Sequence, residues 1–431
     1  MHFDFNQFRT ILAELYGDDP MVLDQQRQRY QSLTNQFRRY FPEVAPLYFS
    51  SPGRTEIGGN HTDHNHGRVL AASVNLDSIA AAAKNGLNRI VLHSEGYPAA
   101  FSVDLSDLNV REGECGTTAA LIRGIAARFR QLGFKVGGFS AFVSSEVMPG
   151  SGLSSSASIE VLIATILNYL FNNGAVPKEQ IALISQYAEN EYFGKPCGLM
   201  DQIICAIGGV VSIDFKEPQH PVIKNINFDF NNTDYRLLVV NTGGNHADLT
   251  PDYAAITAEM KAVARELGAE VCRDINMDRF FQEIRSLRSL TGDRSILRAL
   301  HFLTENERVL HQVGALEQGD FKKFLSLVNE SGNSSFKWLQ NVYSTQNANQ
   351  QGLGLALALT ELFLNQTGAG ACRVHGGGFA GTIQVFLPEK EVQRYASFIE
   401  TIFGAGVAIN LRIRKLGAVC LNQFISSSAE I

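Results

Sequence analysis

The sequence lacks the patterns that mark membrane, nucleic-acid-binding and secreted proteins. No run of about 18 apolar residues occurs, so no membrane span is expected. Residues 1–6 lack the basic and then apolar layout of a signal peptide. The formal net charge is -6 and no long basic stretch occurs, which argues against nucleic acid as the main partner.

Paired cysteines are absent as well. The six cysteines are widely scattered, and none forms a Cys-x-x-Cys pair. A chain of 431 residues has no need of disulfides to hold a small core together. We therefore expect reduced, mostly buried thiols and a cytoplasmic protein.

The length and composition predict a globular protein with two domains. The chain exceeds the size at which one core usually keeps growing, and 45% of its residues are hydrophobic. The predicted helices and strands are mixed without strict alternation, which favours an α+β fold over a doubly wound sheet. A polar stretch at residues 216–221 predicts a boundary that divides the chain into domains 1–219 and 220–431.

Hydrophobic periodicity predicts the individual elements. Helices are expected over residues 5–40, 117–132, 158–173, 178–193, 253–267, 296–314, 320–330 and 352–366. Strands are expected over residues 68–83, 89–94, 100–105, 139–147, 210–214, 235–241, 372–374 and 382–387. Residues 45–54 form a short apolar run that ends in turn chemistry, Ser51-Pro52-Gly53.

The most informative segment is the Gly/Ser loop at residues 150–157, which joins a predicted strand to a predicted helix. Several backbone N–H groups lack partners at a helix N-terminus, and the helix dipole is positive there. Two glycines let the backbone approach a ligand closely, so we expect a phosphate here. The alternative is an ordinary loop in which a serine caps the helix.

A second cluster, residues 53–67, combines three histidines with Asp63, Glu56 and Asn60. The histidine spacing invites a metal interpretation, but it matches no common zinc motif, and a Gly-rich loop holds ligands poorly. Asn, His and Asp side chains supply directional donors and acceptors that suit a polyhydroxylated substrate. A polar surface turn remains the third possibility.

Asp201 lies in an apolar neighbourhood, where a carboxylate is costly without a partner such as arginine. It could take a proton from a hydroxyl nucleophile, or it could cap a helix that starts near Gln202.

The third Gly-rich element is residues 373–381. It is either a loop against substrate or phosphates, or the His-Gly-Gly-Gly segment of lipase-like hydrolases. The hydrolase interpretation needs a Gly-x-Ser-x-Gly elbow, and the sequence contains none.

Taken in order, these segments resemble the GHMP kinases and, within them, the galactokinases. The resemblance runs from Phe8 to Gly417 and includes connecting stretches at residues 303–306 and 315–320. It implies a ribosomal protein S5 domain 2-like N-terminal domain, a ferredoxin-like C-terminal domain and an active site between them. It also implies transfer of the γ-phosphate of ATP to the anomeric hydroxyl of D-galactose. The oligomeric state stays open, a monomer included.

The resemblance assigns roles by position. It implies Asp201 and Arg54 as catalytic residues, and Ser156 and Glu189 as the positions that hold Mg²⁺. The implied phosphate-binding residues are Gly150, Ser151, Gly152, Leu153, Ser154, Ser155 and Ser156. The implied sugar-binding residues are Asn60, His61, Asp63, Gly198 and Tyr253.

Two residues depart from the family's first sugar-binding motif, Gly-Glu-His-x-Asp-Tyr. Asn60 replaces the glutamate, which is associated with the C6 end of the sugar, and His64 replaces the tyrosine. Without that negative charge, a sugar with a C6 carboxylate such as galacturonate is repelled less. Galactose is still favoured as the substrate because most of the sugar-binding positions match those of the galactokinases.

A sugar and ATP sensor without activity is a further alternative. The intact Ser155-Ser156-Ala157 and Asp201 argue against it.

Overall fold

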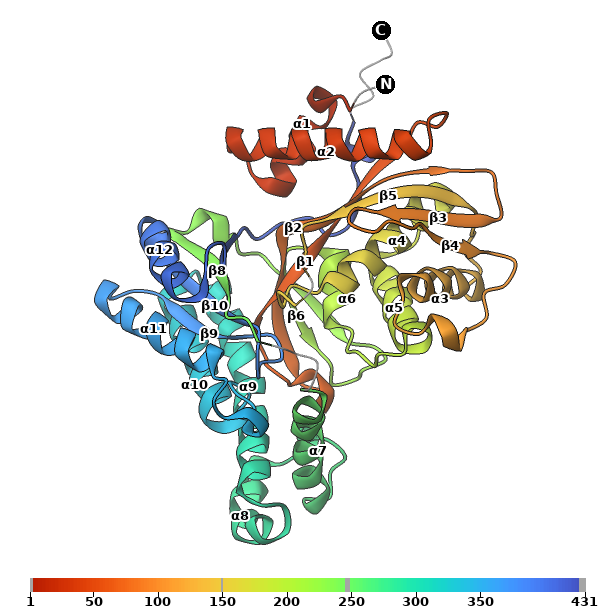
Figure 1. Ribbon diagram of the computed structural model, residues 1–431. Helices are drawn as coiled ribbons and strands as arrows, with labels where there is room; N and C mark the ends of the chain where they lie inside the picture. The colour runs from red at the N-terminus through yellow and green to blue at the C-terminus, as the bar shows by residue number, and fades with distance from the viewer. Residues whose placement is uncertain (1–2, 149, 245–248, 426–431) are drawn as a thin grey trace.

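The computed structural model describes residues 3–148, 150–244 and 249–425. Pro149, which precedes the Gly/Ser loop, lies outside these residues. Two sheets carry the fold, a large one and a smaller one, with helices around both (Figure 1). Helices and strands are mixed without regular alternation, so the predicted α+β class is confirmed.

The helices are placed along the chain as follows: α1 (Phe5–Tyr16), α2 (Pro20–Tyr40), α3 (Thr118–Gln131), α4 (Ser155–Asn172), α5 (Lys178–Ala188), α6 (Met200–Ile207), α7 (Thr250–Glu266), α8 (Met277–Thr291), α9 (Asp293–Glu317), α10 (Phe321–Ser334), α11 (Gly352–Thr367) and α12 (Val392–Phe403). Among the described residues, each helix is too short or too polar to cross a membrane.

The large sheet is built around two long antiparallel strands, and only its β3–β5 pair is parallel among the described strands. Its order is β12 (Val419–Cys420), β1 (Leu47–Gly58), β2 (Arg68–Lys84), β5 (Phe139–Ser145), β3 (Arg89–Ser94) and β4 (Phe101–Asp104). The other half of β2 pairs with β6 (Val210–Asp214), which pairs in turn with β7 (Val222–Ile226). β1 is irregular between Pro52 and Arg54 and between Glu56 and Gly58, where it carries site residues.

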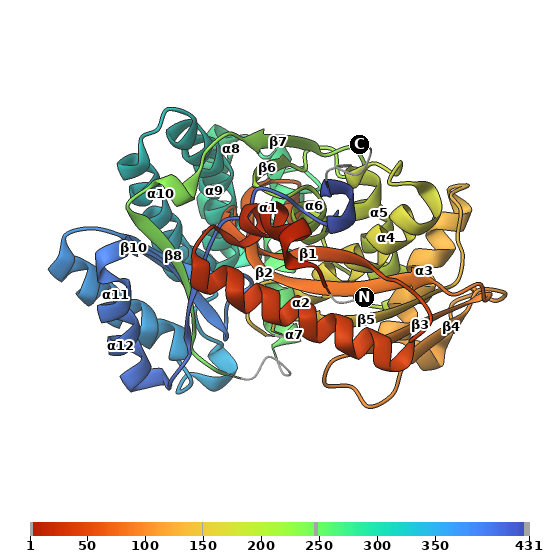
Figure 2. The same ribbon diagram turned by 90° about the horizontal axis from the view of Figure 1, so that it is seen from above.

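Both faces of the large sheet are covered, which explains the nearly continuous apolar run in β2. Ile79 and Ala81 pack against α1 and α2, which lie across the sheet in Figure 2. Ala80 and Ala82 point the other way and pack against α3–α6. The run predicted as a strand or a strand pair is therefore one strand.

The smaller sheet is antiparallel, with the order β11 (Ala408–Leu411), β8 (Tyr235–Asn241), β10 (Thr382–Pro388) and β9 (Ala371–His375). α11 and α12 cover one face, and α9 and α10 cover the other. Residues beyond the predicted boundary at 219/220 add β7 and β12 to the large sheet. The boundary itself stays a prediction.

Several predicted elements need correction. The helix expected over 5–40 is two helices, because Gly17 takes φ +100° and Asp19 caps a new helix at Pro20. The turn expected at the end of residues 45–54 is wrong, since β1 runs on to Gly58. The helix expected to reach residue 193 changes at Glu189 into a π-helical turn. Helices α8 and α12 and strands β7, β11 and β12 were not predicted.

Candidate active site

A pocket of about 340 Å³ lies where β1, the loops after it, the start of α6 and the loop after β9 meet. This volume is in the range of small-molecule sites. The predicted residues that line it are Arg54, Asn60, His61, Asp63, Gly198, Asp201 and Tyr253. It is also lined by Glu56, His64, Lys195, Gly376 and Gly377.

Arg54 and Asp201 form the predicted ion pair at one end of this pocket. Arg54 Nε donates to Oδ1 of Asp201 at 2.7 Å, and Nη2 donates to Oδ2 at 3.0 Å. Burial raises the pKa of Asp201, but the Arg54 charge and hydrogen bonds outweigh it, so the pKa lies below its ordinary value. Asp201 is therefore an ionised carboxylate at neutral pH. It lies in the first turn of α6, and Leu199 occupies the N-cap position.

The Gly/Ser loop reaches the same carboxylate. Ser154, at the N-cap position of α4, makes no capping hydrogen bond and instead donates from Oγ to Asp201. Its φ is +61°, and Gly152 has φ +73°. A Cβ at Gly152 would lie 2.8 Å from His375 Nδ1, so the loop packs directly against the smaller sheet. The serine-cap alternative is thus wrong for Ser154.

Ser156 and Glu189 lie behind the loop. Ser156 Oγ donates to Glu189 Oε1 at 3.2 Å, and Gln202 Nε2 donates to Oε2 of Glu189 at 2.8 Å. Glu160 is buried nearby, and burial together with the Glu189 charge raises its pKa well above the ordinary value. Its Oε1 is buried without a partner. Hydroxyl and carboxylate oxygens are the ligands that Mg²⁺ prefers, so this group fits the ion.

The histidine-rich segment does not form a transition-metal centre. The described residues contain no group of three or more His, Cys, Asp or Glu side chains placed to hold a metal ion. His61 Nε2 instead lies 2.8 Å from the Gly377 carbonyl oxygen, and burial lowers its pKa to about 4. His64 lines the pocket with its side chain half exposed.

Asn60 lies in a buried polar network that joins β1 to the C-terminal half of the chain. Its Nδ2 donates to Glu56 Oε1 at 2.9 Å and to the Gly376 carbonyl at 2.7 Å. Its Oδ1 accepts from Asn341 Nδ2 at 2.8 Å and from Ser335 Oγ at 3.4 Å. Both donor hydrogens and both acceptor positions of the amide thus have protein partners.

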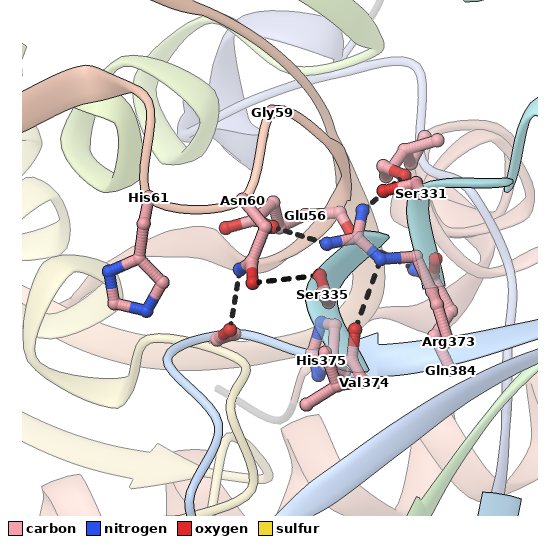
Figure 3. A network of polar contacts seen from close by, with 12 residues as sticks. Glu56, Gly59, Asn60, His61, Ser331, Ser335, Arg373, Val374, His375 and Gln384 are labelled. Atoms are coloured by element: carbon pink, nitrogen blue, oxygen red, sulfur yellow. Dashed lines mark hydrogen bonds and ion pairs between the residues drawn. The ribbon is translucent and has the colours of Figure 1, made fainter. Parts of the chain in front are cut away.

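Glu56 and Arg373 form the centre of this network, and Figure 3 shows their side chains converging with that of Asn60. Arg373 Nη2 lies 2.9 Å from Glu56 Oε1, and Nη1 donates to the Ile57 carbonyl at 2.6 Å. Burial raises the pKa of Glu56, against the opposing charges of Arg373 and Arg54. We name Glu56, Asn60, Arg373 and Asn341 the buried clamp.

The other predicted sugar-binding residues are brought to the pocket wall. A Cβ at Gly198 would lie 2.6 Å from Asp63 Oδ2, so only glycine leaves that carboxylate in place. Tyr253 donates from its hydroxyl to the Gly378 carbonyl at 2.9 Å, and its ring packs on His61. The pKa of Tyr253 is raised to about 12 by burial.

Sequence reasoning missed Glu56–Arg373, Asn341 and Lys195. Arg373 is adjacent to the third Gly-rich segment, but no local pattern indicates a partner more than three hundred residues away. Lys195 stands six residues before Asp201, and its nearness in sequence to that carboxylate is a signal that could have found it.

Comparison with known proteins agrees with this geometry. The family model described as "GHMP kinases N terminal domain" matches residues 120–209, which include the Gly/Ser loop and Asp201. The model described as "Galactokinase galactose-binding signature" matches residues 35–84, which include Arg54 and Asn60. These two matches confirm the predicted resemblance to the galactokinase family of the GHMP kinases.

Similarity to individual galactokinases extends over most of the chain. The galactokinase of Clostridium tetani is 29% identical over 374 residues, covering 86% of this chain and 91% of that protein. The structure of Lactococcus lactis galactokinase complexed with galactose has a TM-score of 0.76 at 25% identity, covering 91% of this chain and 99% of that one. Methanococcus jannaschii mevalonate kinase, at 16% identity and a TM-score of 0.59, shares the fold. The predicted GHMP kinase fold is thereby confirmed.

Proposed function

We propose that this chain phosphorylates D-galactose at its anomeric hydroxyl, with ATP as the phosphoryl donor. Arg54 and Asp201 lie beside the Gly/Ser loop at one end of a pocket of sugar-binding size. The curated galactokinases that resemble the chain over most of its length support the same activity. We place the reaction in the cytoplasm, because ATP is available there and the six cysteines are all free thiols.

Asp201 would act on the sugar hydroxyl. Its carboxylate is ionised and accepts hydrogen bonds from Arg54 and Ser154, so it can orient a hydroxyl and receive its proton. Arg54 holds the carboxylate in place and offsets negative charge as the phosphoryl group is transferred. Holding the sugar hydroxyl and the phosphoryl group in line provides much of the rate enhancement in such a transfer.

The Gly/Ser loop would hold the phosphates. As the first residues of α4, Ser155–Ala157 have N–H groups without intrahelical acceptors, which suits phosphate oxygens. Ser156 and Glu189 would hold Mg²⁺, and the ion would offset the negative charge of the phosphates. Asp63 and His61, which also line the pocket, would contact the sugar hydroxyls.

The observation that carries the proposal is the bidentate Arg54–Asp201 pair next to the loop and open to the pocket. Purified protein with ATP, Mg²⁺ and galactose should release ADP and form galactose 1-phosphate. No turnover with galactose or any other hexose or uronic acid would contradict the proposal.

A second candidate is a kinase for a sugar with a different C6 group, such as galacturonate. Asn60 stands where the family motif has glutamate, and its amide is engaged in the buried clamp. Half-exposed His64 also lines the pocket. The ratio of kcat/KM for galactose and galacturonate decides between the two, and a clear galactose preference removes this candidate.

A further inference from the structure

Lys195 is a charged residue of the pocket that the proposed mechanism does not use. It lines the pocket together with Asp201. Its Nζ lies 3.4 Å from Oε1 of Glu189, and the side chain is 63% exposed. Only the lysine end of this long ion pair is exposed, and solvent around the ammonium screens the attraction. The ammonium can therefore leave Glu189 for a ligand at small cost.

The turn that carries Lys195 fixes where the side chain starts. Gly194, with φ +80°, ends the π-helical turn that begins at Glu189. The Lys195 N–H donates to the Glu189 carbonyl at 3.2 Å, and Cys197 N–H donates to Asn190 Oδ1 at 2.7 Å. Pro196 between them restricts the backbone further. The side chain thus leaves a rigid turn between Glu189 and Asp201.

The other strong cation in the lining of this pocket is already engaged. Arg54 uses Nε and Nη2 on Asp201 and Nη1 on the Gly152 carbonyl. Asp201 lines the pocket and the Glu189 carboxylate lies next to Lys195, so Arg54 alone does not offset the two negative charges that an incoming phosphate meets. The Lys195 ammonium has three N–H donors, and its contact with Glu189 uses one of them. The oxygen that accepts this hydrogen bond, Glu189 Oε1, also accepts one from Ser156 Oγ.

We propose that Lys195 binds the terminal phosphoryl group of ATP and, after transfer, the phosphate of the sugar product. The proposal rests on the proposed function, because the phosphate enters this pocket as ATP. In the transfer, the bond from the γ-phosphorus to the β-phosphate oxygen breaks and a bond to the sugar oxygen forms. The hydroxyl proton goes to Asp201, and ADP leaves. Lys195 donates to the phosphoryl oxygens throughout.

Calorimetric titration with ATP and with ADP, each with Mg²⁺, tests this role. Lys195→Met should weaken ATP binding about tenfold, the loss expected for one charge-assisted hydrogen bond, and leave ADP binding unchanged. It should also lower kcat for sugar phosphorylation, and Lys195→Arg should retain most of the preference for ATP. Lys415→Met is the matched control, because Lys415 is 66% exposed and pairs with Asp229 outside this pocket.

Equal loss of ATP and ADP affinity, or no loss of either, overturns the proposal. So does a changed Mg²⁺ requirement at a constant ratio of ATP to ADP affinity, because Lys195 would then serve only to neutralise Glu189. A protein whose preference for ATP depends on Lys195 but which phosphorylates no sugar supports this inference and contradicts the proposed function. The experiment therefore distinguishes failure of the Lys195 inference from failure of the proposed kinase activity.

Discussion

The two ends of the pocket differ in how their polar groups are engaged. At the buried clamp, Asn60 has protein partners for every donor and acceptor of its amide, and Arg373 is fully buried against Glu56. At the other end, Asp201 is about a third exposed and Lys195 is mostly exposed. The clamp joins Glu56 and Asn60 to residues in the C-terminal half of the chain, whereas the open end keeps charged groups available to substrates. Substitutions at the open end should therefore change catalysis, and those in the clamp should change stability.

The largest effect is expected at Asp201. Asp201→Asn removes the proton acceptor, so kcat should fall by about a thousandfold or more while galactose affinity changes little. Steady-state kinetics and a sugar titration measure the two quantities. Asp214→Asn is the control, because Asp214 also pairs with arginines but lies outside the pocket. Near wild-type turnover in the Asp201 variant would show that this residue is not catalytic.

Arg54→Gln should lower kcat by about a hundredfold, the scale of losing one charge-stabilising donor. It should also shift the pH profile. Arg54 lowers the pKa of Asp201 and burial raises it, so without Arg54 the pKa moves up. The acid limb of kcat/KM against pH should then move to higher pH, because a larger fraction of Asp201 is protonated in weak acid. An unmoved acid limb would mean that Arg54 does not control this carboxylate.

Arg373→Met tests the clamp. It leaves the buried Glu56 carboxylate without its cation, which should cost about 3–5 kcal/mol in free energy of unfolding. Chemical denaturation measures the loss. Arg236→Met, which breaks a more exposed pair with Glu389, should cost at most about 1 kcal/mol. If both variants lose equal stability, the clamp is no stronger than a surface ion pair.

Gly198→Ala should raise KM for the sugar about tenfold and affect kcat less. The added Cβ would lie 2.6 Å from Asp63 Oδ2 and would displace that carboxylate from the pocket wall. Initial rates against sugar concentration separate the two constants. Gly113→Ala, where a Cβ meets nothing within 4 Å, should leave both unchanged. A rise in KM for ATP alone would place Asp63 outside the sugar site.

The smallest effect is expected at His64. His64→Tyr restores the family residue on a half-exposed side chain, so stability should change by less than about 0.5 kcal/mol. The ratio of kcat/KM for galactose to that for galacturonate should rise a few-fold if His64 shapes the pocket wall. A constant ratio would assign sugar selection to other residues.

Local patterns in the sequence, together with the resemblance to the galactokinases, predicted much of the open end. The Gly/Ser loop stands between a strand and a helix, and the predicted pairing of Arg54 with Asp201 is present. The functional roles of these residues stay predictions until they are tested. The buried clamp could not be predicted in this way, because Arg373 and Asn341 lie about three hundred residues from Glu56 and Asn60. Hydrogen bonds at such separations leave no periodic signal in the chain.

By itself, the sequence determined the α+β class, from the order of helical and strand patterns along the chain, and the Gly/Ser loop, from residue types within one short segment. The pairing of Arg54 with Asp201, 147 residues apart, was predicted only from the resemblance to the galactokinases. The tertiary structure alone decided that Ser154 donates a hydrogen bond to Asp201 instead of capping α4. It also decided that the Asn60 amide is hydrogen-bonded within the protein and that Lys195 lines the pocket. These outcomes depend on which partners burial brings within hydrogen-bond distance. A polar side chain bonds to whatever donor or acceptor the packed chain places beside it.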